Sequence, residues 1–201
     1  MIGDLTTYLM KYIDIKNMEG YTQQNKEMTY FLQNLIKNEN IKTAMEIGFN
    51  AGHSAEIFLE SNQNVKLTSF ELGKYSYTKI GKKFIDFKFK NRHQIIIGNS
   101  IKSVPFFIKK NKNVKFDFIF IDGGHFYDIA KKDIFNCQFL AHKDTIVILD
   151  DTNTNPNLVK SWQIGPNRAW NEAKKKNLIY EIGSINFPPN HGISYGKYIL
   201  N

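Results

Sequence analysis

Short, continuous apolar runs separated by longer amphipathic stretches constrain the fold of this chain more than any other feature. The clearest runs are Phe116–Asp122 (FDFIFID) and Thr145–Asp150 (TIVILD), and similar ones occur at Ile41–Gly48, Val65–Leu72 and Gln94–Ile97. Runs of this kind, rich in Ile, Val and Phe, are typical of strands buried on both faces of a parallel sheet. Their alternation with amphipathic stretches predicts βαβ units and therefore an α/β fold.

The amphipathic stretches are the predicted helices. They lie at Gly52–Ser61, after the run that ends at Leu72 and through about Phe87, across Lys102–Lys110, over roughly Tyr127–Leu140 and near Pro166–Lys176. Two late apolar runs, Ile179–Ile185 and Ser194–Leu200, predict a terminal pair of strands that forms a hairpin. An antiparallel pair that completes a mostly parallel sheet narrows the choice of fold.

Residues 1–40 are predicted to form an N-terminal helical segment. Met28, Leu32 and Ile36 recur at helical spacing, as do Phe31 and Leu35, so we expect a helix that covers one edge of the sheet. No repeat, low-complexity tract or linker divides the chain. The 201 residues are therefore predicted to form a single domain, in which residues 41–201 are the α/β part.

Cysteine usage and charge limit where the chain works and what it binds. Cys137 is the single cysteine, which excludes an internal disulfide and fits a reducing, cytoplasmic location. No signal peptide and no membrane-spanning run is recognised, so no membrane partner is expected. The net charge of +8 suits an anionic partner such as nucleic acid or a nucleotide sugar. Alternatively, the positive charge reflects the AT-rich codons of a microbial or large-DNA-virus genome, and the lysines are solvated at the surface without binding a partner. We prefer this second interpretation.

A glycine-rich turn follows the first predicted strand. It reads Glu46-Ile-Gly48-Phe-Asn50-Ala-Gly52-His-Ser54, an E-x-G-x-x-x-G-x-S pattern. The glycines let the backbone turn tightly and approach a ligand, and backbone N–H groups, Asn50 and Ser54 can meet a polar group at the start of the next helix. Neither the P-loop pattern nor the G-x-G-x-x-G of NAD enzymes is present.

Glu71 ends the second predicted strand and lies about twenty residues beyond the turn. An acid in this place can accept hydrogen bonds from both hydroxyl groups of a ribose. The turn alone would also fit a purely structural loop. The turn and Glu71 together predict a nucleoside-binding site at the carboxyl ends of the strands.

The ordered motifs resemble those of class I S-adenosylmethionine-dependent methyltransferases. The resemblance rests on Glu46–Ser54, Glu71, Gly98-Asn99-Ser100 and Phe116–Asp122, and it extends from about Thr43 to the C-terminus. It implies S-adenosylmethionine as the cofactor. It also implies a Rossmann-like, doubly wound, mostly parallel seven-stranded sheet with an antiparallel C-terminal strand and helices on both faces.

The same resemblance implies which residues contact the cofactor. Glu46 and Gly48 are expected near its methionine amino group, Glu71 at its ribose, and Asn99 with Ser100 beside its adenine. The predicted cofactor-binding set is completed by Asn50, Gly52, Ser54 and Asp122.

Three aspartates follow the fourth and fifth predicted strands: Asp122, Asp150 and Asp151. If these strands are neighbours, the three carboxylates converge at one edge and repel one another unless a cation neutralises them. Hard oxygen ligands of this type suit Mg²⁺, which would lower the pKa of a substrate hydroxyl and orient its oxygen. Alternatively, Asp151 caps the next helix and Asp122 only contacts the cofactor amine.

His125 lies three residues beyond Asp122 and is the predicted general base. An imidazole with a pKa near neutrality is suited to accept the proton of a hydroxyl group, and Asp122 completes the predicted catalytic pair. Alternatively, His125 hydrogen-bonds its own loop and helps to position Asp122. The other histidines form no recognisable ligand spacing and there is one cysteine, so a zinc site is not expected.

The stretch Ile121–Tyr127 has an I-D-G-x-H-x-Y pattern, which is followed later by Asp150-Asp151-Thr152. This combination resembles the metal-dependent sugar and small-molecule O-methyltransferases, which are related to the catechol and caffeoyl-CoA enzymes. Catechol enzymes have Asp-Asn in place of Asp150-Asp151 and a lysine in place of His125. The sugar branch is therefore the better match.

This resemblance implies methyl transfer to a hydroxyl of a small acceptor, first a sugar or nucleotide sugar and second a catechol-like phenol. The acceptor pocket is expected from Met18–Gln24 and Thr152–Asn167, with Trp162 and Trp170 in or beside the second segment unless both belong to the core. Two alternatives are a methyltransferase for RNA or another nucleic acid, and a non-catalytic cofactor-binding module. Assembly into a homo-oligomer is left open by the sequence.

Overall fold

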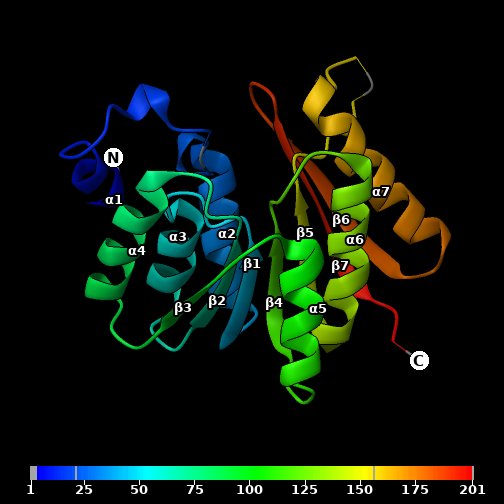
Figure 1. Cartoon of the computed structure of the whole chain (residues 1–201). Helices are drawn as coiled ribbons and strands as arrows, with labels where there is room; N and C mark the ends of the chain where they lie inside the picture. Colours follow the sequence, from blue (N-terminus) through cyan, green and yellow to red (C-terminus); the bar gives the residue numbers. More distant parts are fainter. Residues whose placement is uncertain (1–3, 21, 156, 201) are drawn as a thin grey trace.

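The computed structural model describes residues 4–20, 22–155 and 157–200, and seven strands form one sheet between two layers of helices (Figure 1). The strands are β1 (Thr43–Ile47), β2 (Lys66–Glu71), β3 (His93–Ile97), β4 (Phe116–Ile121), β5 (Ala141–Asp150), β6 (Ile179–Phe187) and β7 (His191–Tyr198). Their order across the sheet is β3-β2-β1-β4-β5-β7-β6. The strand order therefore reverses between β1 and β4, where open α/β sheets bind their ligands.

The directions of the strands confirm the predicted sheet. β1 to β5 are parallel to their neighbours. β7 lies between β5 and β6 and is antiparallel to both, so β6 runs in the same direction as the first five strands. The predicted terminal hairpin is present, and its second strand is the one antiparallel member of the described sheet.

Helices cover both faces of the sheet, as predicted. One face carries α1 (Asp4–Leu9), α2 (Lys26–Asn38), α3 (His53–Ser61) and α4 (Ser76–Lys88), and the other carries α5 (Ser100–Lys110), α6 (Tyr127–Cys137) and α7 (Ile164–Lys175). Because successive side chains of a strand point to opposite faces, Phe118 packs in the first core and Ile119 in the second. None of the described helices is long and apolar enough to cross a membrane.

The N-terminal segment is helical in part, and its placement differs from the prediction. Between α1 and α2 it contains two short 3₁₀ helices, η1 (Ile15–Asn17) and η2 (Thr22–Gln24). Asn25 caps α2 by accepting a hydrogen bond from the Met28 N–H at 2.9 Å. α2 lies on a face of the sheet and not along its edge, because Phe31 packs against Phe187 and Tyr195 at ring-centroid distances of 6.3 and 5.4 Å.

The apolar stripe of α2 explains this placement. Met28, Leu32 and Ile36 are all completely buried, and each such side chain contributes roughly 1.5–3 kcal/mol when it is removed from water. Together with the flanking Phe31, this stripe packs into the core on one face of the sheet. The prediction of an edge position was therefore wrong, whereas the prediction of the helix is confirmed.

Candidate functional site

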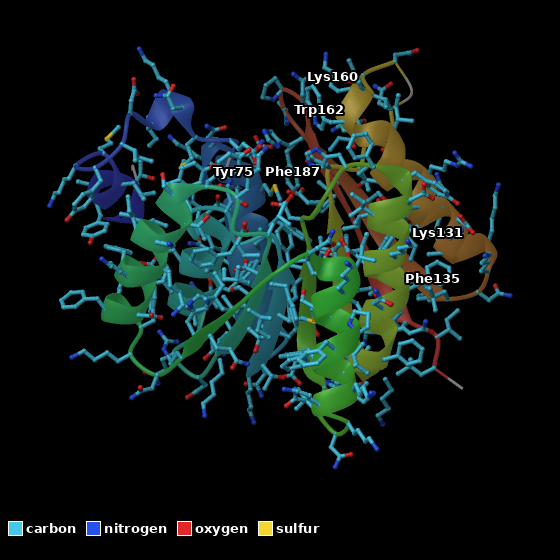
Figure 2. The ribbon with its side chains drawn as sticks, viewed as in Figure 1. Tyr75, Lys131, Phe135, Lys160, Trp162 and Phe187 are labelled. Atoms are coloured by element: carbon cyan, nitrogen blue, oxygen red, sulfur yellow. The ribbon has the colours of Figure 1, made fainter. Side chains whose placement is uncertain are left out.

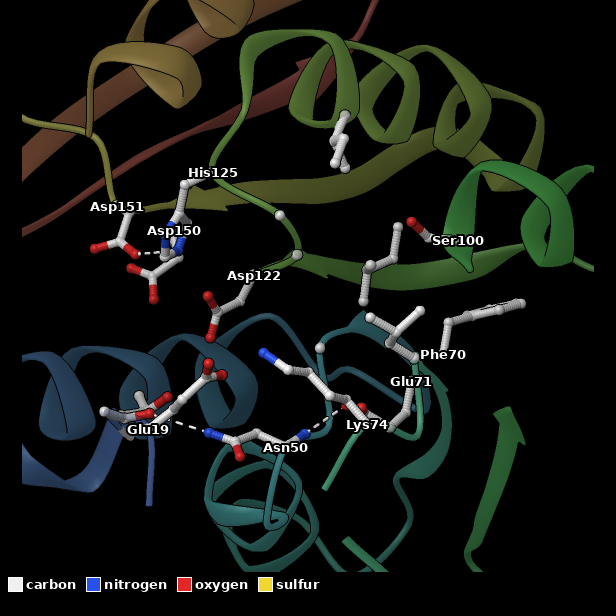
Figure 3. Close-up of a pocket in the computed structure, with 18 of the residues that line it drawn as sticks. Glu19, Asn50, Phe70, Glu71, Lys74, Ser100, Asp122, His125, Asp150 and Asp151 are labelled. Carbon is white, nitrogen blue, oxygen red and sulfur yellow. Dashed lines mark hydrogen bonds and ion pairs between the residues drawn. The ribbon is translucent and has the colours of Figure 1, made fainter. Parts of the chain in front are cut away.

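A large cavity of about 610 Å³ opens at the carboxyl ends of the parallel strands. Its walls come from the loops that follow β1 to β5, together with the segment between η1 and α2 and the region around η4 (Ser161–Gln163). Figure 3 shows the arrangement, with Glu71 and Ser100 at one end and His125 and Asp151 at the other. The cavity thus lies where the strand order reverses.

Gly48 brings the loops after β1 and β4 into contact. Its φ is +101°, and a Cβ on it would lie 1.9 Å from the backbone oxygen of Asp122. The Gly48 N–H donates to the Phe70 carbonyl at 2.8 Å, and the Asp122 N–H donates to the Ile47 carbonyl at 2.9 Å. Only glycine permits this approach without displacing the loop that carries Asp122.

The Glu71 carboxylate is fixed by two backbone groups. Oε2 accepts from the Asn50 N–H at 2.7 Å and Oε1 accepts from the Gly73 N–H at 2.8 Å. Each carboxylate oxygen has a second lone pair, so both can still accept from a ligand. Glu71 lines the cavity together with Gly48 and Asn50.

Glu46, Gly52 and Ser54 lie beneath the turn and do not line the cavity. The Glu46 carboxylate is completely buried and accepts from Ser54 Oγ at 2.6 Å and from Ser69 Oγ at 2.5 Å. Burial raises its pKa to about 7, although the two hydroxyl groups oppose that shift. The structure therefore places these three residues one layer below the surface that a ligand would touch.

Asn99 and Ser100, at the start of α5, line the same end of the cavity as Glu71. Asn99 is the N-cap residue, and its Oδ1 accepts from the Ile101 N–H at 3.0 Å. Ser100 is the first residue of the helix and faces the cavity, together with the apolar side chains of Phe70 and Leu72. This end combines a flat apolar wall with a few polar groups.

Asp122, His125 and Asp151 converge at the acidic end of the cavity. Each offers a ligand atom, and these atoms lie within 4.8 Å of one another. His125 Nε2 is 2.8 Å from Asp151 Oδ2. This contact raises the pKa of His125, while burial and the neighbouring charge of Asp151 raise the pKa of Asp122 to about 8. The group has the composition of a divalent-cation site.

Asp150 lines the cavity but is not one of these three converging ligands. It is 8% exposed, and its Oδ1 has no hydrogen-bond partner among the described residues. Burial and the charges of Asp122 and Asp151 raise its pKa well above the ordinary value. All three predicted aspartates therefore line the cavity, and His125, not Asp150, joins Asp122 and Asp151 in the converging group.

Several cavity residues were not predicted individually. Glu19 and Tyr75 meet across the mouth, where the Tyr75 hydroxyl donates to Glu19 and Lys74 Nζ donates to Tyr75 at 2.8 Å. Asn50 Nδ2 donates to the Gly20 carbonyl at 3.1 Å and ties the same segment to the glycine-rich turn. The only signal in the sequence was the position of Glu19 in the segment Met18–Gln24, which was expected to contribute to the acceptor pocket.

The two predicted tryptophans have different positions. Trp162 lines the cavity and is 42% exposed, whereas Trp170 is buried in the core. Figure 2 shows Tyr75 and Trp162 at the same end of the molecule, on opposite sides of the sheet. Residues 21 and 156, within the two predicted acceptor segments, lie outside the described residues.

Comparison with known proteins gives a consistent result. A family model described as a methyltransferase domain matches residues 45–152, which is more than half of the chain and includes the turn, Glu71, Asp122 and His125. No curated protein matches the sequence. The similarity to methyltransferases is therefore seen in the match to the family model and in the three-dimensional structure.

Three solved structures illustrate the similarity in fold. An O-methyltransferase from Bacillus cereus in complex with SAH has a TM-score of 0.70 at 16% identity, covering 96% of this chain and 88% of that one. TomG from Streptomyces achromogenes, in complex with SAM, has a TM-score of 0.71 at 15% identity, covering 96% and 88%. CalS11, a TDP-rhamnose 3'-O-methyltransferase of calicheamicin biosynthesis, has a TM-score of 0.66 at 16% identity, covering 96% and 90%.

Proposed function

The chain belongs to the methyltransferase-domain family, and from that membership we propose that it methylates a hydroxyl group of a small acceptor with the help of a divalent cation. It is an S-adenosylmethionine-dependent methyltransferase, in which the cofactor supplies the methyl group and the protein supplies orientation and charge control. The observation that carries the proposal is the convergence of Asp122, His125 and Asp151 at one end of a cavity whose other end suits a nucleoside.

The residues of the nucleoside end fit the cofactor. Glu71 retains two lone pairs for the ribose hydroxyl groups, and Asn50 Oδ1 is buried without a hydrogen-bond partner among the described residues. Asn99 and Ser100, beside the apolar wall, suit the adenine. In this arrangement Glu46, Gly52 and Ser54 support the turn from below. Gly48 and Asn50, and not Glu46, would then contact the cofactor.

The residues of the acidic end fit Mg²⁺. Asp122 and Asp151 would hold the ion with the help of Asp150, whose buried Oδ1 has no hydrogen-bond partner among the described residues. When bound there, Mg²⁺ lowers the pKa of an acceptor hydroxyl. Without a cation, little positive charge offsets the negative charges of the three neighbouring carboxylates. The raised pKa values of Asp122 and Asp150 are consistent with this repulsion.

His125 is the proposed general base. Its Nε2 accepts the proton of the acceptor hydroxyl while the acceptor oxygen takes the methyl group and the C–S electron pair stays on sulfur. Because His125 Nε2 contacts Asp151 Oδ2 in this structure, this contact has to break before Nε2 can accept the proton. Asp151 would then stabilise the imidazolium that forms, since an adjacent carboxylate favours the charged ring.

A sugar is the favoured acceptor. Glu19 provides a carboxylate that accepts hydrogen bonds from hydroxyl groups, and Trp162, which also lines the cavity, provides a flat apolar surface. These side chains come from the two segments that were expected to build the acceptor pocket. One structurally similar protein, CalS11, is a TDP-rhamnose 3'-O-methyltransferase, and this supports a sugar acceptor.

Calorimetric titration tests the proposal directly. S-adenosylmethionine is titrated into the protein with Mg²⁺, without Mg²⁺ and after treatment with EDTA. We expect micromolar cofactor binding in each case and a separate Mg²⁺ signal that disappears in Asp150→Ala. Cofactor binding with no metal signal would reject the metal-assisted mechanism, and absence of cofactor binding would reject the function as a whole.

A further inference from the structure

Basic residues gather at the end of the sheet where the parallel strands begin, opposite the cavity (Figure 1). The last turns of α2, α4, α5 and α7 lie there and carry these lysines: Lys37, Lys88, Lys109, Lys110, Lys174 and Lys175. Lysine in a last turn complements the dipole of its helix, so these positions have a structural reason. The bases at the starts of the strands are not explained in this way.

Each of the first five strands has a basic residue at or near its first position. In the order of the sheet from β3 to β5, these residues, which we call the basic row, are Arg92, Lys66, Lys42, Lys115 and Lys143. The backbone aligns neighbouring members, since the Lys66 N–H donates to the Lys42 carbonyl at 2.8 Å. The next N–H of β2, that of Leu67, donates to the Arg92 carbonyl at 2.8 Å. Neighbouring strands lie about 4.8 Å apart, so the row is roughly 19 Å long.

The charge of the basic row is not compensated within the described chain. Its four lysines are exposed, and none of them forms an ion pair with a described acid. Lys115 Nζ and Arg92 Nη1 donate to backbone carbonyls at 2.9 and 3.0 Å, which leaves their positive charge in place. Of the acids at this end, Asp117 is occupied by backbone N–H groups, and Glu39 and Asp144 are exposed. Positive charge is therefore in excess here.

The cavity end of the molecule has the opposite charge. Lys74 is the one lysine or arginine among the described residues that line the cavity, where it faces these carboxylates: Glu19, Glu71, Asp122, Asp150 and Asp151. Charge is therefore separated along the strands, with acids at their carboxyl ends and the basic row at their amino ends. A codon bias adds lysines without regard to their place in the fold, so it does not explain a row with one base for each strand.

We propose that the basic row docks the phosphate backbone of double-stranded DNA without reading its sequence. B-DNA carries one negative charge per about 1.7 Å of its axis, so a row of roughly 19 Å faces several phosphates at once. A row matches a linear polyanion, whereas a lipid surface presents its charge over a plane. Lysine, which predominates in the row, contacts phosphate as a point charge, and such contacts position DNA without carrying sequence information.

DNA bound to the basic row lies at the far end of the molecule from the cavity. It is therefore a partner that localises the protein and not the methyl acceptor, and the inference does not depend on the proposed function. The carboxylates around the cavity repel phosphate, which favours the same orientation. Saturation with DNA should therefore leave the affinity for S-adenosylhomocysteine unchanged.

The test measures how DNA binding depends on salt. The affinity of the native protein for a short fluorescent duplex is measured by anisotropy between about 50 and 200 mM KCl. We expect a dissociation constant of about 10⁻⁶–10⁻⁴ M near physiological salt and a slope of about −4 for log K against log salt, as four to five phosphate contacts require. The triple variant Lys42→Gln/Lys66→Gln/Lys115→Gln removes three contacts, so the slope should weaken by about 2.7 and the affinity should fall about tenfold or more.

A matched variant removes the same charge at the cavity end. Lys16→Gln/Lys26→Gln/Lys102→Gln changes exposed lysines near the starts of their helices and outside the cavity lining. It should keep the native slope and affinity. Equal losses in the two triple variants would show that DNA responds to net charge alone and would overturn the proposal.

The remaining outcomes are also decisive. No DNA binding by the native protein at the lowest salt overturns the proposal, as does binding to vesicles of anionic phospholipid in place of DNA. Competition between DNA and S-adenosylhomocysteine places DNA at the cavity and overturns it too. If the first triple variant does not fold, Lys66→Gln alone should weaken the slope by about 0.9, and an unchanged slope rejects the row. Loss of S-adenosylhomocysteine binding with DNA binding intact rejects the proposed function and not the row.

Discussion

Two histidine–aspartate pairs bridge β4 and β5, one at each end of these strands. At the amino end His142 Nε2 is 3.0 Å from Asp117 Oδ1, and at the carboxyl end His125 Nε2 is 2.8 Å from Asp151 Oδ2. Both histidines are partly exposed. The residue types and distances are nearly the same, so the difference between the pairs comes from their surroundings.

The pair at the amino end is fully satisfied within the chain. Asp117 Oδ2 accepts from the backbone N–H groups of Lys42 and Thr43 at 2.9 and 2.8 Å and from the Thr43 hydroxyl at 3.0 Å. Burial alone would raise the pKa of Asp117, but these donors and His142 outweigh it and lower the pKa. This carboxylate needs no ligand, because Lys42, Thr43 and His142 already supply its partners.

The pair at the carboxyl end is surrounded by further acids. Asp122 and Asp150 lie beside it, and burial together with mutual repulsion raises the pKa of each. Asp150 Oδ1 is buried and has no hydrogen-bond partner among the described residues. The comparison teaches that a histidine–aspartate pair indicates chemistry only where its surroundings leave charge uncompensated.

The largest expected effect concerns activity. His125→Ala should lower kcat by about 10²- to 10⁴-fold, the usual contribution of a general base, and leave the affinity for S-adenosylmethionine nearly unchanged. His142→Ala is the matched control and should leave kcat close to native. Methyl transfer is measured with a panel of sugar acceptors, and cofactor affinity by calorimetry. A loss of cofactor affinity in His125→Ala, or equal activities of the two variants, would break the comparison.

The next effect concerns stability. Asp117→Asn should lower the free energy of unfolding by about 1.5–3 kcal/mol, because the new amide cannot accept from all the donors around it. The pKa of Asp117 is lowered in the folded state, so its stabilisation is present above the unfolded value of about 4 and is lost as the pH falls further. Urea unfolding at pH 7 and pH 3 should therefore show a difference between native and variant that narrows in acid.

The smallest effect has the opposite sign. Asp150→Asn removes one of the crowded charges and should raise the stability of the metal-free protein by about 1 kcal/mol, while it weakens Mg²⁺ binding. Thermal unfolding with and without Mg²⁺ measures both effects. The native protein should gain stability on addition of Mg²⁺ and the variant should gain less. A variant less stable than the native protein without Mg²⁺ would show that Asp150 is satisfied internally.

Much of the fold follows from local patterns in the sequence. The apolar runs at β4 and β5 identify central strands because only such strands are buried on both faces. The same patterns place Glu71 and Asp122 at strand ends, where parallel topology brings them to one edge. The position of α2 on the face of the sheet could not be predicted from local patterns. It depends on contacts of Phe31 with Phe187 and Tyr195, which are distant in the sequence.

The finer organisation of the site depends on contacts that sequence spacing does not encode. Glu46 was assigned to the ligand surface by its motif, yet its carboxylate turns inward to Ser54 and Ser69. Glu19 reaches the cavity only because its segment is tied to Asn50 and Tyr75. A pattern of residue types predicts which strand end a side chain is near, whereas its hydrogen bonds decide which way it points.

The position of β7 has a consequence for synthesis of the protein. β7 follows β6 in the chain but lies between β5 and β6 in the sheet, so its backbone groups complete the ladders of both neighbours. While the chain emerges from the ribosome, β5 therefore presents an unpaired edge until residues 191–198 have appeared. Unpaired edges invite association with other chains. During a translational pause after β6, the exposed edge of β5 should therefore be most prone to associate with other chains. A chaperone that covers β5 at this stage would prevent such association.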